Sequence, residues 1–87
     1  MPVSEMLARD PRQLGMALRR ARRALNLSQS AVASKAGVTQ ATVSLLEGGA
    51  EGVKLKTVTD VMAALGVEFV IRPRRTTAAT DDVAGLF

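Results

Sequence analysis

The chain of 87 residues is long enough for one small domain with a single core, and it has no apolar stretch long enough for a signal peptide or a membrane span, so we expect a cytoplasmic protein that binds no membrane. With no cysteine and no histidine it cannot build a Cys/His zinc site, a Ser-His-Asp triad, a Cys-His pair or a disulfide, and we expect no enzyme activity, no metal and no cofactor. Residues 1–75 carry all twelve Lys and Arg residues against six acidic ones, a net charge of +6, whereas residues 76–87 carry two aspartates.

The first predicted element is an amphipathic helix that begins at Pro11, with Asp10 as its N-cap. Six arginines lie between Arg9 and Arg23; of these, Arg12, Arg19 and Arg23 point outward from this helix, and Arg22 flanks its apolar stripe. Such a basic surface indicates a polyanionic partner, most often nucleic acid, although a solvated face is the alternative for each arginine taken singly. The apolar stripe of the helix consists of Leu14, Leu18, Ala21 and Leu25.

Two short helices follow, joined by a tight turn. Ser28 is the predicted cap of the first, which ends at Gly37, and Thr39 caps the second, which ends at Gly48 or Gly49. Helices of about two turns are unstable alone, so both must pack into a bundle. The arrangement has helix-turn-helix geometry.

The outward face of the second short helix carries Gln40, Ala41 and Ser44. These side chains suit the major groove of B-DNA, where a Gln amide can pair with adenine and an Ala methyl can contact thymine. The alternative is an ordinary solvated face. Leu45 lies between the faces, either as a thymine-methyl contact or as a packing residue, and packing is the favoured interpretation.

A polar loop after Gly49 leads into another helix, which ends at Gly66. The segment after it, VEFVIRPRR, is rich in β-branched and aromatic residues until Pro73, and it is predicted to be a strand. A lone strand leaves backbone groups unpaired, so we expect it to pair with the same strand of a second copy; the alternative is an extended segment on its own domain. The residues expected on the core side of the helix are Leu55, Val58, Val61, Met62 and Leu65, and those expected in the dimer strand are Val67, Phe69 and Ile71.

The stretch LSQSAVASKAGVTQATVSLLEGG, residues 27–49, resembles the lambda-repressor-like, or Xre-type, helix-turn-helix family, and the resemblance extends from residue 14 to residue 66. It implies that Glu47 pairs internally with Arg22 and does not face DNA. It also implies roles in DNA binding for two groups of residues. The base-contacting group is Gln40, Ala41 and Ser44, and the phosphate-contacting group is Gln29, Thr39, Arg19, Lys54 and Lys56, with solubility as the alternative for the lysines.

A helical body with a terminal strand is similar to the HipB-type antitoxins, which dimerise through that strand, repress their own operon and bind a HipA-type kinase toxin. In that group the terminal tail can reach the toxin. The resemblance therefore implies that Leu86 and Phe87 contact a toxin, with a frayed terminus as the alternative.

The expected fold is all-α with a small β addition, a four- to five-helix lambda-repressor-like bundle whose C-terminal strand forms an intermolecular sheet in a homodimer. We expect an N-terminal arm over residues 1–10, a DNA-binding and dimerisation domain over 11–72 and a flexible tail over 73–87. The expected function is that of a HipB-like antitoxin that represses its own operon at a palindromic double-stranded operator and binds a HipA-like kinase toxin. The alternatives are a stand-alone or phage-type repressor and a protein-interaction adaptor that does not read DNA.

Overall fold

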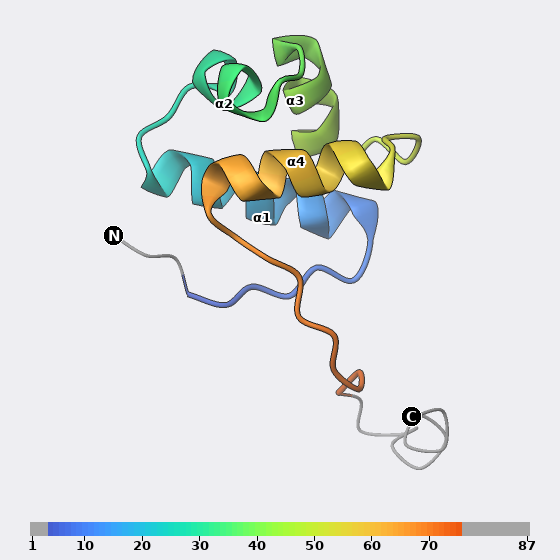
Figure 1. Cartoon of the computed structure of the whole chain (residues 1–87). Helices are drawn as coiled ribbons and strands as arrows, with labels where there is room; N and C mark the ends of the chain where they lie inside the picture. Colours follow the sequence, from blue (N-terminus) through green and yellow to red (C-terminus); the bar gives the residue numbers. More distant parts are fainter. Residues whose placement is uncertain (1–3, 76–87) are drawn as a thin grey trace.

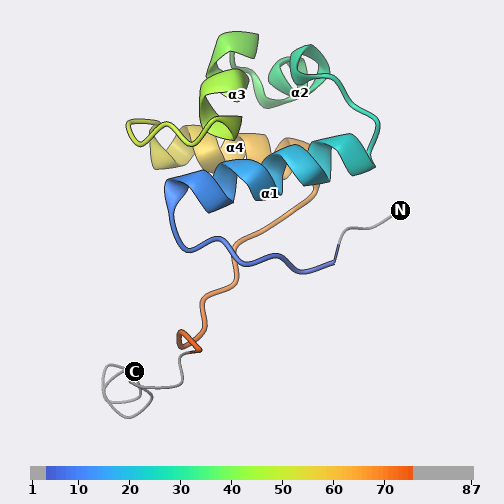
Figure 2. The same cartoon turned by 180° about the vertical axis from the view of Figure 1, so that it is seen from behind.

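The computed structural model describes residues 4–75, which form four helices around one core (Figure 1). The helices are α1 (Pro11–Ala24), α2 (Gln29–Ala36), α3 (Gln40–Glu47) and α4 (Leu55–Leu65). The α1 and α4 helices lie beside each other, and α2 and α3 lie together on one side of this pair (Figures 1 and 2). The described residues therefore form the predicted all-α helix-turn-helix bundle, with four helices and no fifth.

The helix ends follow from local sequence. The side chains of Asp10, Ser28 and Thr39 each accept a hydrogen bond from the backbone N–H of the third residue after them, which satisfies a donor that the first turn of a helix leaves unpaired. Gly37 and Gly66 end α2 and α4 in the left-handed conformation, with φ of 73° and 70°. These five predicted ends are confirmed.

Apolar residues from all four helices meet in one core. Two expectations about its extent are wrong: Leu55 is 68% exposed, because the first residue of α4 projects beyond the packed region, and Leu25 at the end of α1 is 42% exposed. The buried core residues are Leu18, Ala21, Val32, Ala33, Val43, Leu46, Val58, Val61, Met62 and Leu65.

A close approach between helices is made at Gly15 of α1, which is buried against the C-terminal end of α3. A Cβ atom at Gly15 would lie 2.4 Å from the carbonyl oxygen of Leu46 and 2.7 Å from that of Glu47. Gly49 makes a second close contact, since a Cβ there would lie 2.9 Å from the Cα of Arg12. These glycines let α1 pack directly on the backbone at the end of α3.

The segment before α1, residues 4–10, and the segment after α4, residues 67–75, lie against each other (Figures 1 and 2). Arg9 donates a hydrogen bond of 3.1 Å to the carbonyl oxygen of Arg75, and Arg72 lies 3.8 Å from the carboxylate of Glu5. No strand is formed within residues 4–75 of this single chain. Of the predicted strand residues, Val67 packs against the core, whereas Phe69 is 48% and Ile71 is 89% exposed. Leu86 and Phe87 lie outside the described residues.

Candidate nucleic-acid interface

A short turn joins α2 to α3. Helix α2 ends at Ala36 and α3 begins at Gln40, so three residues connect the two helices. Gly37 takes the left-handed conformation, and the backbone N–H of Val38 returns to the carbonyl oxygen of Ala33 at 3.0 Å. With the bond from the Gly37 N–H to Ser34, this closure satisfies two carbonyl groups near the end of α2.

One side of α3 is anchored in the core and the other is open. Val43 and Leu46 are buried, whereas the predicted base-contacting residues Gln40, Ala41 and Ser44 are all exposed. The preference for a packing role at Leu45 is wrong, because its side chain is 60% exposed. At about 100° per residue, Leu45 flanks Ala41 on the side away from Ser44. The open face of α3 therefore combines an amide, a methyl, a hydroxyl and an isobutyl group.

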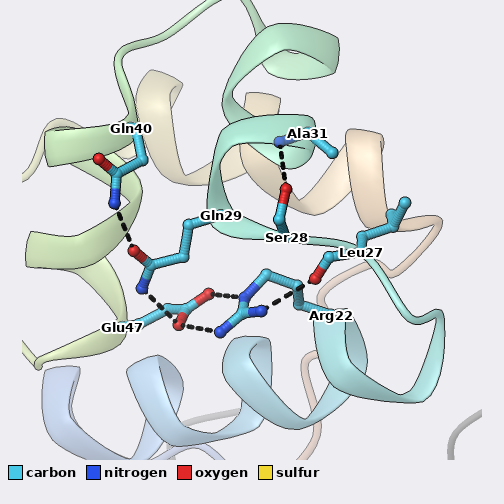
Figure 3. A network of polar contacts seen from close by, with 7 residues as sticks. All are labelled: Arg22, Leu27, Ser28, Gln29, Ala31, Gln40 and Glu47. Atoms are coloured by element: carbon cyan, nitrogen blue, oxygen red, sulfur yellow. Dashed lines mark hydrogen bonds and ion pairs between the residues drawn. The ribbon is translucent and has the colours of Figure 1, made fainter.

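A largely buried ion pair lies beneath this face. Arg22 of α1 donates from Nε to one carboxylate oxygen of Glu47 at 2.6 Å and from an η nitrogen to the other at 3.0 Å (Figure 3). Its remaining η nitrogen donates to the carbonyl oxygen of Leu27 at 2.9 Å, so one guanidinium links α1, the α1–α2 turn and the end of α3. The side chain of Arg22 is 12% exposed and that of Glu47 is 6% exposed. The structure thus brings together the pair that the family resemblance implied.

Two glutamines extend the ion pair to the open face. Gln29, the first residue of α2, donates from its amide nitrogen to the carboxylate of Glu47 at 3.1 Å. Gln40, the first residue of α3, donates from its amide nitrogen to the side-chain oxygen of Gln29 at 2.7 Å (Figure 3). Sequence reasoning missed this connection, although both glutamines directly follow predicted N-caps and so share the same end of their helices.

The electrostatics of Glu47 reflect these contacts. Burial alone would raise the pKa of its carboxyl, but hydrogen bonds from Arg22 and Gln29 favour the charged form more strongly and hold the pKa below its ordinary value. The hydrogen bonds that Arg22 donates to Glu47 raise the pKa of Arg22. Glu47 is therefore a carboxylate at neutral pH, directed inward to the ion pair.

The predicted phosphate-contacting residues occupy several settings. Arg19 is exposed on α1. The Thr39 hydroxyl is engaged in capping α3 and lies 2.9 Å from the hydroxyl of Thr42. Lys54 is exposed at the N-terminal end of α4, and Lys56 forms a solvent-exposed ion pair of 2.9 Å with Asp60. Arg19 and Lys56 thus lie on α1 and α4, and Thr39 and Lys54 lie directly before α3 and α4.

Two kinds of feature are absent from residues 4–75. No cluster of three acidic, cysteine or histidine side chains is placed to bind a metal ion. Among the same residues, no helix has the length and apolar character needed to cross a bilayer.

A helical domain with a three-residue turn before an anchored, outward-facing α3 has the architecture of a helix-turn-helix protein. The family model described as "Helix-turn-helix domain" matches residues 13–77, and the chain belongs to this family. No curated protein sequence matches the chain significantly.

Solved structures agree with this assignment. A HipB variant in complex with an O2 20-mer matches with a TM-score of 0.77 and 25% identity, over 83% of this chain and 100% of that one. A HipB–O4 20-mer complex matches with a TM-score of 0.76 and 25% identity, over 82% and 100% of the two chains. A chain of a HipA–HipB–O2–O3 complex matches with a TM-score of 0.72 and 25% identity, over 84% and 100%. The resemblance to HipB-type proteins is thereby confirmed.

Proposed function

We propose that this chain is a sequence-specific DNA-binding repressor that acts as a homodimer on a palindromic operator and serves as a HipB-like antitoxin. The observation that carries the proposal is the open face of α3, which presents Gln40, Ala41 and Ser44 on a helix anchored by Val43 and Leu46. The likeness to HipB complexes supports the same function.

The chemistry of this face suits direct reading of bases. A Gln amide can pair with the N6 and N7 edge of adenine, and the Ser44 hydroxyl can pair with several base edges. Ala41 lets the helix approach closely and presents a methyl group to thymine. Gln29 and Thr39 at the helix starts, with Arg19, Lys54 and Lys56, contact phosphates and fix the register of the domain on the duplex without reading sequence.

A second copy completes the apolar C-terminal segment. Phe69, Val70 and Ile71 are exposed in the single chain, and their backbone forms no sheet there. Pairing residues 67–71 with the same segment of a second copy would satisfy that backbone and cover these side chains. The two α3 helices of the dimer would then enter successive major grooves about 34 Å apart.

A HipA-like kinase toxin is the proposed protein partner, because one of the matching structures is a HipA–HipB complex. The proposed contact is the C-terminal tail with Leu86 and Phe87. The repressor acts in the cytoplasm, without enzymatic activity of its own. The proposed organisation is an arm over residues 1–10, the domain over 11–72 and a tail over 73–87.

The experiment is fluorescence anisotropy of the purified protein with DNA from upstream of its own gene and with scrambled DNA, over a range of salt concentrations. Tight, salt-sensitive and selective binding supports the repressor. Gln40→Ala should cost about 1–3 kcal/mol on the preferred site and remove discrimination at one base pair. Arg19→Ala should weaken binding to all sequences alike and lower the salt slope by about 1. Equal, weak binding to both DNAs would contradict the repressor and favour the adaptor.

The antitoxin role has a separate test. The full chain and a chain that lacks residues 76–87 are each mixed with the product of a kinase-like gene next to their own. Binding of the full chain and weaker binding of the shortened chain support the antitoxin and its tail contact. Equal binding of both chains contradicts the tail contact, and no binding by either favours a stand-alone repressor.

A further inference from the structure

The hydrogen bonds beneath α3 have a fixed direction. A carboxylate accepts hydrogen bonds and cannot donate them, so Gln29 must turn its amide nitrogen, which donates, toward Glu47. The Gln29 oxygen must then point the other way, toward Gln40, and it accepts from the Gln40 nitrogen at 2.7 Å. Reversing either amide would bring two oxygens into contact. The charge on Glu47 therefore sets the orientation of both glutamines.

This orientation decides what Gln40 offers to solvent. One of its two amide hydrogens is used by Gln29, while its side-chain oxygen and its second hydrogen have no partner among the described residues. The open end of Gln40 therefore presents one acceptor and one donor. Adenine offers the matching donor and acceptor at N6 and N7, whereas guanine offers two acceptors at O6 and N7.

We propose that Glu47 is a positioning residue for base specificity: through Gln29 it holds the Gln40 amide in the orientation that selects adenine and rejects guanine. The proposal rests on the DNA-reading function proposed above. Glu47 contributes without touching DNA, because it is directed inward to Arg22 and keeps 6% of its exposure. If its acceptor-only character is lost, both glutamines can reverse, and Gln40 can then present two donors, which fit guanine.

The test measures the ratio of affinities for two operators that differ only at the base pair whose discrimination Gln40→Ala removes, one with A·T and one with G·C. For the wild type we expect a preference of about 5- to 150-fold for A·T. In Glu47→Gln the amide at position 47 can donate as well as accept, and the ratio should fall by about fivefold or more.

The matched control is Arg22→Lys. This variant weakens the ion pair and lowers the melting temperature, but leaves Glu47 a carboxylate, so the A·T to G·C ratio should stay within about twofold of wild type. A second variant, Gln29→Met, interrupts the connection and leaves both residues of the ion pair in place. It should reduce the A·T to G·C ratio as Glu47→Gln does. It also keeps the proposal testable if circular dichroism shows that Glu47→Gln does not fold.

The outcomes separate this proposal from the function on which it rests. If the wild type binds all DNA sequences equally, both the proposed DNA-reading function and the positioning role of Glu47 are wrong. If the wild type is selective but Gln29→Met and folded Glu47→Gln keep its ratio, the positioning role alone is wrong. The same holds if Arg22→Lys loses the ratio equally, or if Gln40 selects G·C in the wild type. The positioning role is supported if Gln29→Met and Glu47→Gln lose the A·T to G·C ratio and Arg22→Lys keeps it.

Discussion

Replacing Gly15 with alanine tests whether α1 and α3 touch backbone to backbone. In an ordinary exposed helix the change would stabilise the fold by about 1 kcal/mol, because alanine has a higher helix propensity than glycine. Here the new Cβ would lie 2.4 Å from the carbonyl oxygen of Leu46 and 2.7 Å from that of Glu47. Both neighbours are backbone atoms at the end of a packed helix, so no flexible side chain can move aside.

The strain should exceed the gain in propensity. Inserting atoms into a packed core costs about 1–3 kcal/mol, and a contact this short with backbone belongs at the upper end. After the gain of about 1 kcal/mol, the net loss is about 2 kcal/mol, or about 8–16 °C in melting temperature for a domain of this size. A repressor dimer would unfold in a concentration-dependent way, so the comparison needs equal protein concentrations.

The measurement is urea and thermal unfolding of Gly15→Ala beside Gly48→Ala as the matched control. A Cβ at Gly48 would lie 3.4 Å and 3.5 Å from the nearest atoms, an ordinary contact, and the φ of Gly48 is −80°, which alanine adopts readily. Gly48→Ala should therefore change stability by less than about 1 kcal/mol. The direct contact of α1 with the α3 backbone is refuted if Gly15→Ala is as stable as the wild type, or if the two variants behave alike.

Three further predictions concern the ion pair and the open face. In urea unfolding, Arg22→Ala should cost about 3–5 kcal/mol by leaving Glu47 charged and unpaired, against about 0.5 kcal/mol or less for Lys56→Ala in the exposed pair; equal losses would contradict this. The pKa of Glu47 is lower in the folded than in the unfolded state, so its stabilising contribution is complete above the unfolded pKa of about 4.3 and disappears as pH falls through the folded pKa. The difference in melting temperature between wild type and Glu47→Gln should therefore shrink from pH 6 to pH 3. A difference that stays constant over this range would refute the stabilising role of the Glu47 charge. Leu45→Ala should weaken operator binding by about 0.8 kcal/mol for each methyl group that no longer touches the DNA. When operator thymines are replaced with uracil one at a time, one position should weaken the wild type and leave the variant unaffected, whereas a thymine that Ala41 contacts should affect both proteins. Anisotropy titrations that show the same sensitivity in both proteins at every position would exclude a thymine contact by Leu45.

The open face of α3 was predictable in part. Its hydrophobic period alone predicts that Val43 faces the core and that Gln40, Ala41 and Ser44 face outward, as they do in the structure. The period could not decide Leu45, which lies near the boundary of the face, because its burial depends on whether a neighbouring helix covers that side. Among the described residues none does, and the side chain stays open.

Sequence by itself determined five of the helix ends. An N-cap such as Ser28 or Thr39 bonds a backbone N–H three residues away, and a glycine such as Gly37 ends a helix through its own φ, so neither depends on the rest of the fold. The amphipathic stripes are local in the same sense, since they arise from the 3.6-residue period. These features place the two short helices and the turn between them.

Tertiary structure decided the contacts beneath the open face of α3, of which the family resemblance had implied only the Arg22–Glu47 pair. Arg22 and Glu47 are 25 residues apart, and Gln29 and Gln40 are 11 apart, so no local period relates them. The meeting of Arg22 with Glu47 depends on how closely α1 crosses the end of α3, which depends in turn on the missing side chain at Gly15. Hydrogen-bond direction then passes from a buried carboxylate to an exposed amide, and this requires distances near 3 Å that only the packed helices set.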